Sequence, residues 1–332
     1  MVIYLIVNFL ITNFRVVFFQ DTNSLIFKSI PSALGVSKLN NFIVNSITVP
    51  RIPGEAAGAI CKLTNTDTQE CLTINVEYNH LDSLLKEKWN PLGDIKNEKG
   101  YSHFPGNLNV LIFELSSYLE TLNKTRGLMP EFVNPKYADA EKTQFKAPTR
   151  LECLMQDYPQ LIPGAKIGFV MYDRLMSFSP CKNNLQEAVA KFKNGLPTDC
   201  GFSIEMDTFQ SNCENLEKLG LLEIIEKDKF PSVDVCGVKI PFKYPKIIIK
   251  PSFAVSLKDL RMRIKQPLRM AANATLVLEG PEGVLENLEM QDGTCFFNNG
   301  KMTITNRYEY VALKEDEGRN FEKMRGFKLV KT

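Results

Sequence analysis

The 332-residue sequence lacks the charge imbalance that marks many nucleic-acid-binding proteins. Its 40 Lys and Arg residues nearly balance 38 Asp and Glu residues, and no block of like charge stands out. The formal net charge of +2 therefore gives no electrostatic support for a nucleic-acid partner. With 44% hydrophobic and 23% charged residues, the composition is that of an ordinary soluble globular protein, and the length suits one large domain or two ordinary ones.

The cysteine spacing lacks any metal-binding or disulfide pattern. No two cysteines form a C-x-x-C pair, and neither His80 nor His103 lies near a cysteine in the sequence. This gives no support for a zinc site, and a disulfide scaffold is not expected in a chain this long. We therefore expect reduced thiols and a cytoplasmic protein. The eight cysteines are Cys61, Cys71, Cys153, Cys181, Cys200, Cys213, Cys236 and Cys295.

The chain also lacks a clean membrane or secretion signal at its start. The first nineteen residues, MVIYLIVNFLITNFRVVFF, are strongly apolar, but Asn8, Asn13 and Arg15 interrupt them. A membrane helix needs about twenty apolar residues. A secretory signal needs a basic start and a small-residue cleavage site, and neither is present. A buried strand, or sequence from an imperfect start, is favoured over a membrane or targeting segment.

The apolar patterning that is present predicts an α/β arrangement up to about residue 220. Residues 16–19 predict a short buried strand of a parallel sheet, followed by a helix from Thr22 or Asn23 to about Ile30, after which Pro31 resets the chain. Further strands are expected over 42–50, 56–64, 71–79 and 166–173, with the second and third of these paired around a polar turn. Helices are expected over 109–124, over 149–162 with an end before Pro159, and over 205–220 with Gly220 as terminator.

After residue 225 the pattern changes to short apolar stretches split by Gly, Pro, Asn and Asp. Helical periodicity is nearly absent there, apart from SLKDLRMRI at 256–264. This predicts a small β-rich, solenoid-like domain. We place the boundary within 225–250, with residues 14–235 in the first domain, 236–332 in the second and 1–13 as an N-terminal extension.

Polar motifs follow one another in a definite order along the chain. They are FFQDTN, NSITVPRIPGEAAGAICKLT, INVEYNHLD, FPGNLN, EFVNPKYADAEKTQFKAPTRLECLMQDYPQ and FSPCKNN. Together they closely resemble the UDP-sugar pyrophosphorylases, which are UTP:monosaccharide-1-phosphate uridylyltransferases of the UDPGP type. The NPKYADAEKTQFKAPTRLECLMQDYP segment is highly specific to these enzymes, whereas VEY and FSPxKN are shared with the N-acetylhexosamine branch. The resemblance runs from about residue 14 to the end.

The resemblance implies a Rossmann-like nucleotidyltransferase core of glycosyltransferase-A type, incomplete at its N-terminus, and a small C-terminal β-helix-like domain. It implies a reaction in which UTP and a sugar 1-phosphate give a UDP-sugar and pyrophosphate. A phosphate oxygen attacks the α-phosphorus in line, so the protein has to position two polyanions and neutralise their charge. Mg²⁺ is the implied cofactor, because it binds a carboxylate or two together with substrate phosphates and water.

Two charged residues match the catalytic part of the family pattern. Asp21 in FFQDTN matches the metal-binding aspartate at a strand end, and Lys182 in FSPCKNN matches the lysine that reaches the phosphates. The resemblance implies that Asp21 and Lys182 converge on one pocket. Taken alone, the Asp-Thr-Asn sequence is also explained by a helix cap, and Lys182 by a solvated surface lysine.

Three further residues match positions that contact the sugar. Gly58 in EAAGAI matches a glycine whose backbone approaches the sugar, Glu77 in NVEYN a glutamate that accepts from hydroxyl groups, and Asn107 in FPGN an asparagine that both donates and accepts. Their alternatives are a strand bulge, a surface carboxylate and a turn residue. His80 and His103 lie near motifs but are not expected to be catalytic, because a phosphate nucleophile needs no general base.

The sequence departs from the family in one important respect. The glycine-rich loop of the GGLGERLG kind, the uracil-contacting segments and the HGD motif that precede FFQDTN in the family do not occur here. Residues 1–13 stand where the preceding helix would be and do not resemble it. We therefore hypothesise a fragment, from a mispredicted gene start or a split product, and expect this chain alone to be inactive or nearly so.

Three functions compete at this point. The first is a Mg²⁺-dependent uridylyltransferase whose partners are UTP, sugar 1-phosphates, UDP-sugars and pyrophosphate, with no nucleic acid and no membrane. The second is a non-catalytic remnant that binds a sugar phosphate or stabilises a partner. The third is a membrane-anchored interaction protein that uses residues 1–19.

Overall fold

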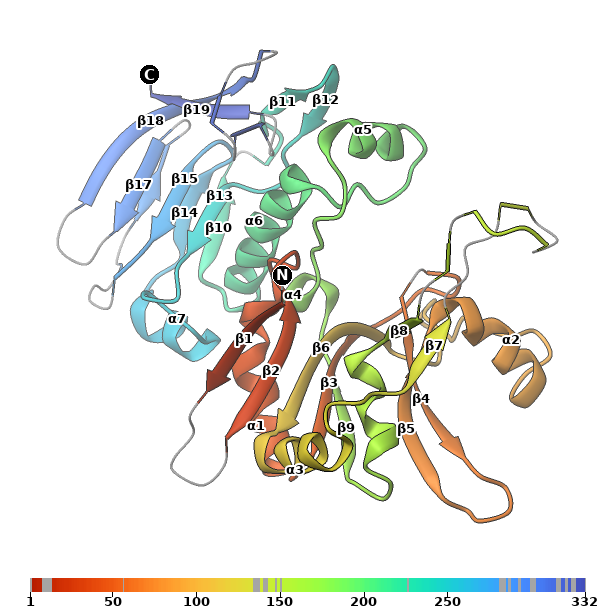
Figure 1. Ribbon diagram of the computed structural model, residues 1–332. Helices are drawn as coiled ribbons and strands as arrows, with labels where there is room; N and C mark the ends of the chain where they lie inside the picture. Colours follow the sequence, from red (N-terminus) through yellow and green to blue (C-terminus); the bar gives the residue numbers. More distant parts are fainter. Residues whose placement is uncertain are drawn as a thin grey trace. The chain divides into compact units, whose positions relative to one another are not determined.

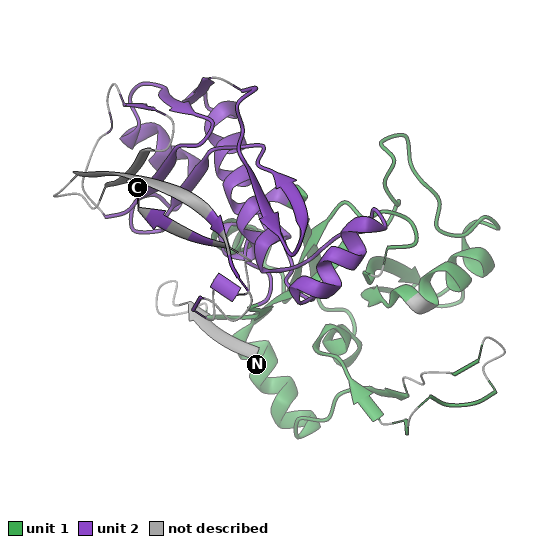
Figure 2. Ribbon diagram, turned by 90° about the horizontal axis from the view of Figure 1, so that it is seen from above, with its two compact units in different colours: residues 1–21, 29–174 green, residues 22–28, 175–332 purple. Residues whose placement is uncertain are grey.

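The protein has a mixed α/β fold, seen in a computed structural model (Figure 1). The structure describes residues 2–7, 14–55, 57–133, 138–139, 143–146, 148–149, 151–225, 227–280, 285, 288–291, 294–298, 303–314, 318–319, 322–323 and 327–331. The chain divides into two compact units (Figure 2). Unit 1 comprises residues 1–21 and 29–174, and unit 2 comprises residues 22–28 and 175–332. The expected domain boundary at residue 235 stays a prediction.

Unit 1 is built on a seven-stranded sheet with the order β1-β2-β6-β3-β9, to which β4 and β5 are added through β6 (Figure 1). Its strands are β1 Val2–Val7, β2 Arg15–Gln20, β3 Val44–Val49, β4 Ala59–Thr64, β5 Cys71–Val76, β6 Gly106–Glu114 and β9 Ile167–Met171. All pairs are antiparallel except β3 with β9. The parallel sheet predicted around residues 16–19 is therefore wrong. A buried apolar run shows that both faces of a strand are covered, but it does not show the direction of its neighbours.

Helices cover both faces of this sheet. On one face, Asn45 of β3 donates to the carbonyl of Ala33 and to the Ser37 hydroxyl of α1 Ile30–Leu39. On the other, the rings of Phe113 and Tyr158 lie 4.8 Å apart, beside α3 Leu115–Thr125 and the 3-10 turn η2 Met155–Leu161. Alternate residues of a strand point to opposite faces, so each central strand contributes to both layers.

The structure corrects three predicted helices in the first 162 residues. The helix expected before Ile30 is only the short 3-10 turn η1 Ile26–Lys28, and α1 starts at Ile30 with Pro31 in its first turn, where the absent N–H costs no hydrogen bond. The helix expected over 109–124 is strand β6 followed by α3. The change occurs at Glu114, whose carboxylate accepts the amides of Ser116 and Ser117.

The third correction concerns residues 149–162. These form strand β8 Leu151–Cys153, which pairs with β7 Glu131–Val133, and then η2, with Pro159 inside the turn rather than after it. Proline excludes a regular α-helix there because it has no N–H. The predicted strands over 42–50, 56–64, 71–79 and 166–173 are confirmed in their greater part as β3, β4, β5 and β9, and β4 pairs with β5 as expected. The end of the third prediction is wrong, because helix α2 begins at Tyr78, and residue 56 lies outside the described residues.

Unit 2 contains short strands that pair in parallel, as well as helices. β10 Leu222–Ile225, β14 Leu268–Ala271 and β16 Glu289–Met290 form one parallel set, and β13 Lys246–Ile249, β15 Thr275–Leu278 and β17 Thr294–Asn298 form another. The other elements at or after the start of unit 2 are α4 Arg174–Ser177, α5 Leu185–Lys193, α6 Gly201–Lys218, β11 Ser232–Val235, β12 Val238–Pro241, α7 Leu257–Arg263, β18 Thr303–Ala312 and β19 Phe327–Lys331. Unit 1 contains one more helix, α2 Tyr78–Lys88. The recurrence of short strands predicted after residue 225 is thus present.

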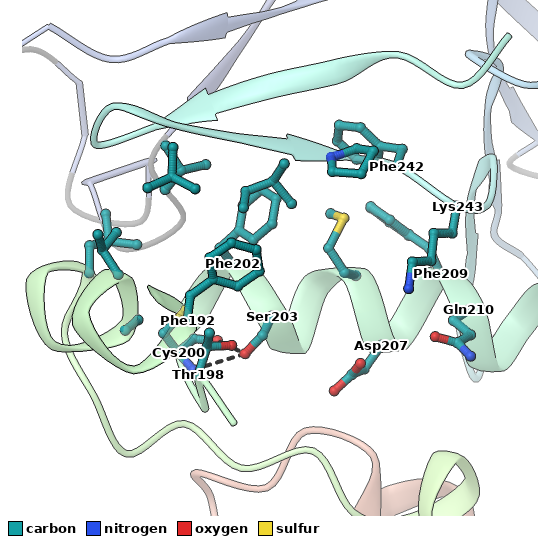
Figure 3. A pocket seen from close by; sticks show the side chains of 18 of the residues that line it. Phe192, Thr198, Cys200, Phe202, Ser203, Asp207, Phe209, Gln210, Phe242 and Lys243 are labelled. Atoms are coloured by element: carbon teal, nitrogen blue, oxygen red, sulfur yellow. Dashed lines mark hydrogen bonds between the residues drawn. The ribbon is translucent and has the colours of Figure 1, made fainter. Parts of the chain in front are cut away.

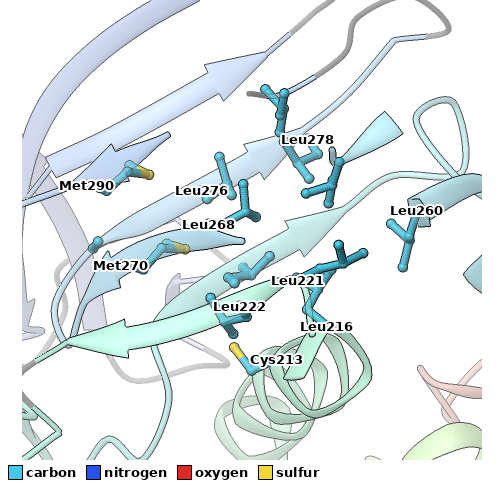
Figure 4. Packing of buried hydrophobic residues seen from close by; sticks show 14 of the residues in the cluster. Cys213, Leu216, Leu221, Leu222, Leu260, Leu268, Met270, Leu276, Leu278 and Met290 are labelled. Carbon is cyan, nitrogen blue, oxygen red and sulfur yellow. The ribbon is translucent and has the colours of Figure 1, made fainter. Parts of the chain in front are cut away.

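The core of unit 2 lies between α6 and the parallel strands (Figure 4). Leu216 of α6 packs with Leu222 of β10, Leu268 of β14 and Leu276 of β15, all at most 8% exposed. The predicted helix over 205–220 is confirmed as the main part of α6, which ends at Lys218 two residues before Gly220 with its positive φ of 70°. Among the described residues, no helix is both long and apolar enough to cross a membrane.

Candidate functional site

A chain of hydrogen-bonded polar side chains occupies the end of the β4–β5–β6 part of the unit 1 sheet. Asn107 of β6 donates through Nδ2 to Oδ1 of Asn75 in β5 at 3.1 Å, and Asn75 donates through Nδ2 to Oε1 of Glu77 at 2.7 Å. The backbone N–H of Asn107 donates to the carbonyl of Gly58 at 2.8 Å. Three residues that sequence motifs identified separately, Gly58, Glu77 and Asn107, therefore belong to one cluster.

Gly58 lies against the side chain of Asn75. A Cβ atom at Gly58 would be 2.4 Å from Oδ1 of Asn75 and 2.8 Å from its Nδ2. These separations are far below van der Waals contact, so any larger residue would displace the Asn75 amide. Glycine is thus required here by a close side-chain approach, and the strand-bulge alternative is not needed to explain it.

Glu77 occupies the N-cap position of helix α2 in an extended backbone conformation, immediately after β5, and its side chain makes no capping hydrogen bond. Its Oε1 accepts a second hydrogen bond, at 2.5 Å, from Nε2 of Gln156 in η2. Asn75 and Gln156 are each only 8% exposed, so both donors are held in a buried setting. Burial raises the pKa of the neighbouring Asp157, and the negative charge of Glu77 raises it further. Glu77 is therefore a carboxylate with one oxygen fixed by two amides.

An irregularity in the β3–β6 pairing determines where Asn107 points. The register shifts between Ile47 and Thr48 of β3, and Asn109 on the opposite strand has a left-handed backbone with φ 55°. The amide N–H of Asn109 donates to Oδ1 of Asn107 at 3.0 Å. Bulges of this kind turn a side chain out of the regular strand alternation, and here the bulge keeps the Asn107 amide within reach of Asn75.

A buried ion pair supports the loop that carries Gly58. Arg51 is 2% exposed, and its guanidinium binds the carboxylate of Asp94 at 2.5 Å and the carbonyl of Ala57 at 2.9 Å. Asp94 also accepts the Ser102 hydroxyl at 2.6 Å. Burying both charges is tolerable because each has several hydrogen-bond partners. This network holds the chain at residue 57, next to the glycine.

Asp21 lies in the turn that directly follows strand β2 and is exposed. The next residues, Thr22 to Lys28, belong to unit 2. There the side chain of Asn23 donates to the carbonyl of Ser177 at 2.7 Å and accepts the N–H of Ser179 at 2.9 Å. The carbonyl of Thr22 accepts the N–H of Cys181 at 2.8 Å. The residue after Asp21 is therefore hydrogen bonded to the residue before Lys182.

Lys182 is exposed in the segment before α5 of unit 2. Its backbone N–H and that of Asn183 both donate to the carbonyl of Asp199, at 2.7 and 3.0 Å. Asp199 has a left-handed backbone with φ 44°, which turns its carbonyl toward these donors. The backbone of Lys182 is thus fixed, while its ammonium group is exposed to solvent.

An apolar cavity of about 400 Å³ lies within unit 2, between α5, α6 and the β11–β12 hairpin (Figure 3). Phe192, Phe202 and Phe242 form much of its lining, and Asp207, Gln210 and Lys243 lie toward one end. None of the five predicted site residues lines this cavity. Its apolar lining does not suit phosphate groups, so the cavity is not a candidate for the predicted chemistry.

The side chains that could bind a metal ion can be compared with the needs of Mg²⁺, the cofactor that the motifs imply. In the described part of the chain, no three His, Cys, Asp or Glu side chains gather in a way that suits a metal ion. Mg²⁺ does not require such a cage, because one or two carboxylates suffice when substrate phosphates and water complete its coordination. The exposed carboxylate of Asp21 fits this mode of binding.

The two histidines have no place in these networks. His80 is exposed on α2, and the ring of His103 packs edge-on against Trp89 at 5.2 Å.

Two residues of the hydrogen-bonded cluster, Asn75 and Gln156, were not identified as candidate site residues from the sequence. One signal was present, because Asn75 stands inside an apolar strand and two residues before Glu77, a spacing that places both on the same side of an extended chain.

Comparisons with known proteins agree with the motifs. UDP-sugar pyrophosphorylase of Oryza sativa subsp. indica is 40% identical over 327 residues, which cover 95% of this chain and 52% of the rice protein. UDP-sugar pyrophosphorylase of Arabidopsis thaliana is 41% identical over 285 residues, which cover 86% of this chain and 45% of that protein. No family model matches the chain.

The chain spans about half the length of the curated relatives that it matches. Among solved structures, the uridine diphosphate N-acetylglucosamine pyrophosphorylase of Trypanosoma brucei in complex with an inhibitor is similar with a TM-score of 0.40 and 15% identity, covering 73% of this chain and 43% of that one. The sequence relatives confirm the resemblance that the ordered motifs predicted.

Proposed function

Because the chain is a homologue of the UDP-sugar pyrophosphorylases over 95% of its own length, we propose that it forms the sugar- and phosphate-binding part of a uridylyltransferase. The reaction would convert UTP and a monosaccharide 1-phosphate into a UDP-sugar and pyrophosphate. The observation that carries the proposal is the cluster in unit 1. Gly58, Glu77 and Asn107 come from different motifs and share one hydrogen-bonded network through Asn75.

The proposed roles follow from the chemistry of each side chain. Glu77 accepts hydrogen bonds from sugar hydroxyl groups, and Asn107 offers an amide that donates and accepts. Gly58 leaves room for the close approach of another group. These three residues orient the sugar so that its phosphate oxygen faces the α-phosphorus of UTP, and orientation of this kind is a main source of rate acceleration in phosphoryl transfer.

The charged residues neutralise the reacting phosphates. Lys182 places a compact ammonium group against phosphate oxygens, and Asp21 is the residue that would hold Mg²⁺. When bound, Mg²⁺ would neutralise charge on the phosphate oxygens as a Lewis acid. The proposal needs Asp21 and Lys182 to act at one place. It is supported by the hydrogen bond between their chain neighbours, Thr22 and Cys181.

We propose that unit 1 is part of a Rossmann-like nucleotidyltransferase core, in which β3 and β9 form the parallel pair and the other described strand pairs are antiparallel. We also propose that the parallel strands of unit 2 form a β-helix, whose successive coils are β10 with β13, β14 with β15, and β16 with β17. A cytoplasmic location is consistent with free cysteines at seven described positions. The alternative is a remnant that binds a sugar phosphate without catalysis.

Steady-state assays test the proposal. The 332-residue chain lacks the glycine-rich loop that holds the triphosphate in the family, so we expect it alone to form little or no UDP-sugar. A protein of the relatives' length that contains this chain should release pyrophosphate from UTP when Mg²⁺ and glucose 1-phosphate are present, and EDTA should abolish the reaction.

Point variants of that longer protein separate catalysis from mere binding. In it, Asp21→Ala and Lys182→Ala should each lower kcat by roughly 10²–10³-fold, because each removes charge stabilisation at the phosphates. Both side chains are exposed, so folding should be unchanged. Asp228→Ala and Lys193→Ala are the matched controls, since they remove exposed charges in unit 2 and should have no effect. Full activity in Asp21→Ala would reject the assignment and leave the non-catalytic alternative.

A further inference from the structure

The orientations of the Asn107 and Asn75 amides in the unit 1 cluster are determined by one backbone group. The N–H of Asn109 can only donate, so the atom of Asn107 that it contacts must be Oδ1. The Nδ2 of Asn107 then donates to Oδ1 of Asn75, which leaves Nδ2 of Asn75 to donate to Glu77. The direction of hydrogen bonding therefore runs one way, from the backbone of β6 to the carboxylate.

This direction leaves the two oxygens of Glu77 in different states. Oε1 accepts from both Asn75 and Gln156. Among the described residues, no side chain or backbone group donates to Oε2. A carboxylate oxygen accepts about two hydrogen bonds, so Oε1 is saturated and Oε2 retains its full capacity. Asn107 likewise uses one of its two Nδ2 hydrogens within the cluster and keeps the other.

We propose that Asn75 and Gln156 are positioning residues that orient Glu77 and Asn107 toward the hydroxyl groups of the sugar, and thereby determine how well the site distinguishes a sugar phosphate from phosphate alone. The inference rests on the proposed function. Neither amide touches the sugar. Asn75 and Gln156 act by holding Glu77 and Asn107 so that Glu77 Oε2 and the second Asn107 hydrogen stay available to a ligand, which reduces the conformational freedom that binding would otherwise have to remove.

Gly58 also helps to position the Asn75 amide. Its missing side chain makes room for the Asn75 amide, so the glycine contributes to sugar binding through Asn75 as well as through its own backbone. A buried amide with both of its polar ends engaged is costly to rearrange, which explains why such a relay can hold a carboxylate in one rotamer.

Ligand titration of the 332-residue chain tests the inference. Glucose 1-phosphate, galactose 1-phosphate and inorganic phosphate would be titrated in the presence of Mg²⁺ and followed by ¹⁵N NMR. Asn75→Asp keeps the shape and the acceptor toward Asn107 but cannot donate to Glu77, and Gln156→Met keeps the length but has no donor. Each variant should bind the sugar phosphates about 3- to 30-fold more weakly, and inorganic phosphate with unchanged affinity.

A matched control removes a buried asparagine of the same sheet that lies outside the cluster. Asn45 of β3 is fully buried and bonds to α1, so Asn45→Ala should lower stability without changing the ratio of sugar-phosphate to phosphate affinity. If that ratio also stays unchanged in Asn75→Asp and Gln156→Met, the positioning role is refuted while the proposed function survives. If the unmodified chain binds neither sugar phosphate, the proposed function fails first, and the inference with it.

Discussion

Substitution of Gly58 by alanine offers a quantitative test of how tightly the polar cluster is packed. The backbone of Gly58 does not have a positive φ, so alanine meets no conformational penalty there. The whole cost must come from the new methyl group, which would lie 2.4 Å from Oδ1 of Asn75. To relieve that contact, the Asn75 amide has to move and give up its bonds to Asn107 and Glu77.

The size of the effect can be worked out from these contacts. Loss of the neutral bond to Asn107 costs about 1 kcal/mol, and loss of the bond to the Glu77 carboxylate costs about 1.5–3 kcal/mol. We therefore expect Gly58→Ala to lower the free energy of unfolding by about 3 kcal/mol, or somewhat more if the displaced amide strains its neighbours. In an Asn75→Ala background the obstacle is absent, and the same change should cost less than about 0.5 kcal/mol.

Urea unfolding followed by tryptophan fluorescence measures this directly. Trp89 is the single tryptophan of the sequence and lies in unit 1, with its ring edge-on to Phe104 at 5.1 Å, so its emission reports on the unit that carries the change. Gly100→Ala is the control. Gly100 has φ 82° and open space around it, so alanine there should cost about 1 kcal/mol in either background. Equal costs of Gly58→Ala with and without the Asn75 side chain would refute the packing explanation.

Three further perturbations follow from other contacts. Arg51→Met should destabilise unit 1 by about 3–5 kcal/mol in urea unfolding, because Asp94 is left buried without its cation, and a cost below 1 kcal/mol would contradict this. Asn23→Ala should lower the stability of unit 2 by about 2–3 kcal/mol, measured by thermal unfolding, since it removes both side-chain bonds to residues 177 and 179; exposed Asn194→Ala is its control. Burial lowers the pKa of Lys28 to about 8, so the unfolded chain binds this proton more strongly than the folded protein does. The free energy of unfolding of the unmodified protein, relative to that of Lys28→Met, should therefore rise by about 3 kcal/mol between pH 8 and pH 10.5 in urea unfolding. A constant difference between the two proteins across that range would refute this.

Much of the sheet of unit 1 could be predicted, because its strands are short apolar runs bounded by turn residues. The hairpin of β4 and β5 and the strands β3 and β9 were all expected. The helix predicted over 109–124 was wrong because an unbroken apolar run is compatible with both a buried strand and a helix. Only the capping carboxylate of Glu114 marks the change from one to the other.

The candidate site shows the same limit more sharply. Gly58, Glu77 and Asn107 were found because they stand in recognisable motifs, and their placement in one cluster was implied by the family pattern. Asn75 and Gln156 could not be found in that way, since their importance comes from hydrogen bonds across β5, β6 and η2. Asn75 has only the weak signal of its place two residues before Glu77, and Gln156 in η2 has no distinctive signal until its neighbours in space are known.

The short segment Thr22–Lys28 has a practical consequence for anyone who wishes to dissect this molecule. It belongs to unit 2 although the sequence on both sides of it belongs to unit 1. A truncated protein that starts at Leu175 would lack the ammonium group of Lys28 opposite Ser211 and Asn212, and the Asn23 amide that holds the backbone at residues 177 and 179. No single cleavage, by protease or by cloning, yields unit 2 intact, so isolating it calls for circular permutation or for supplying residues 22–28 as a separate peptide.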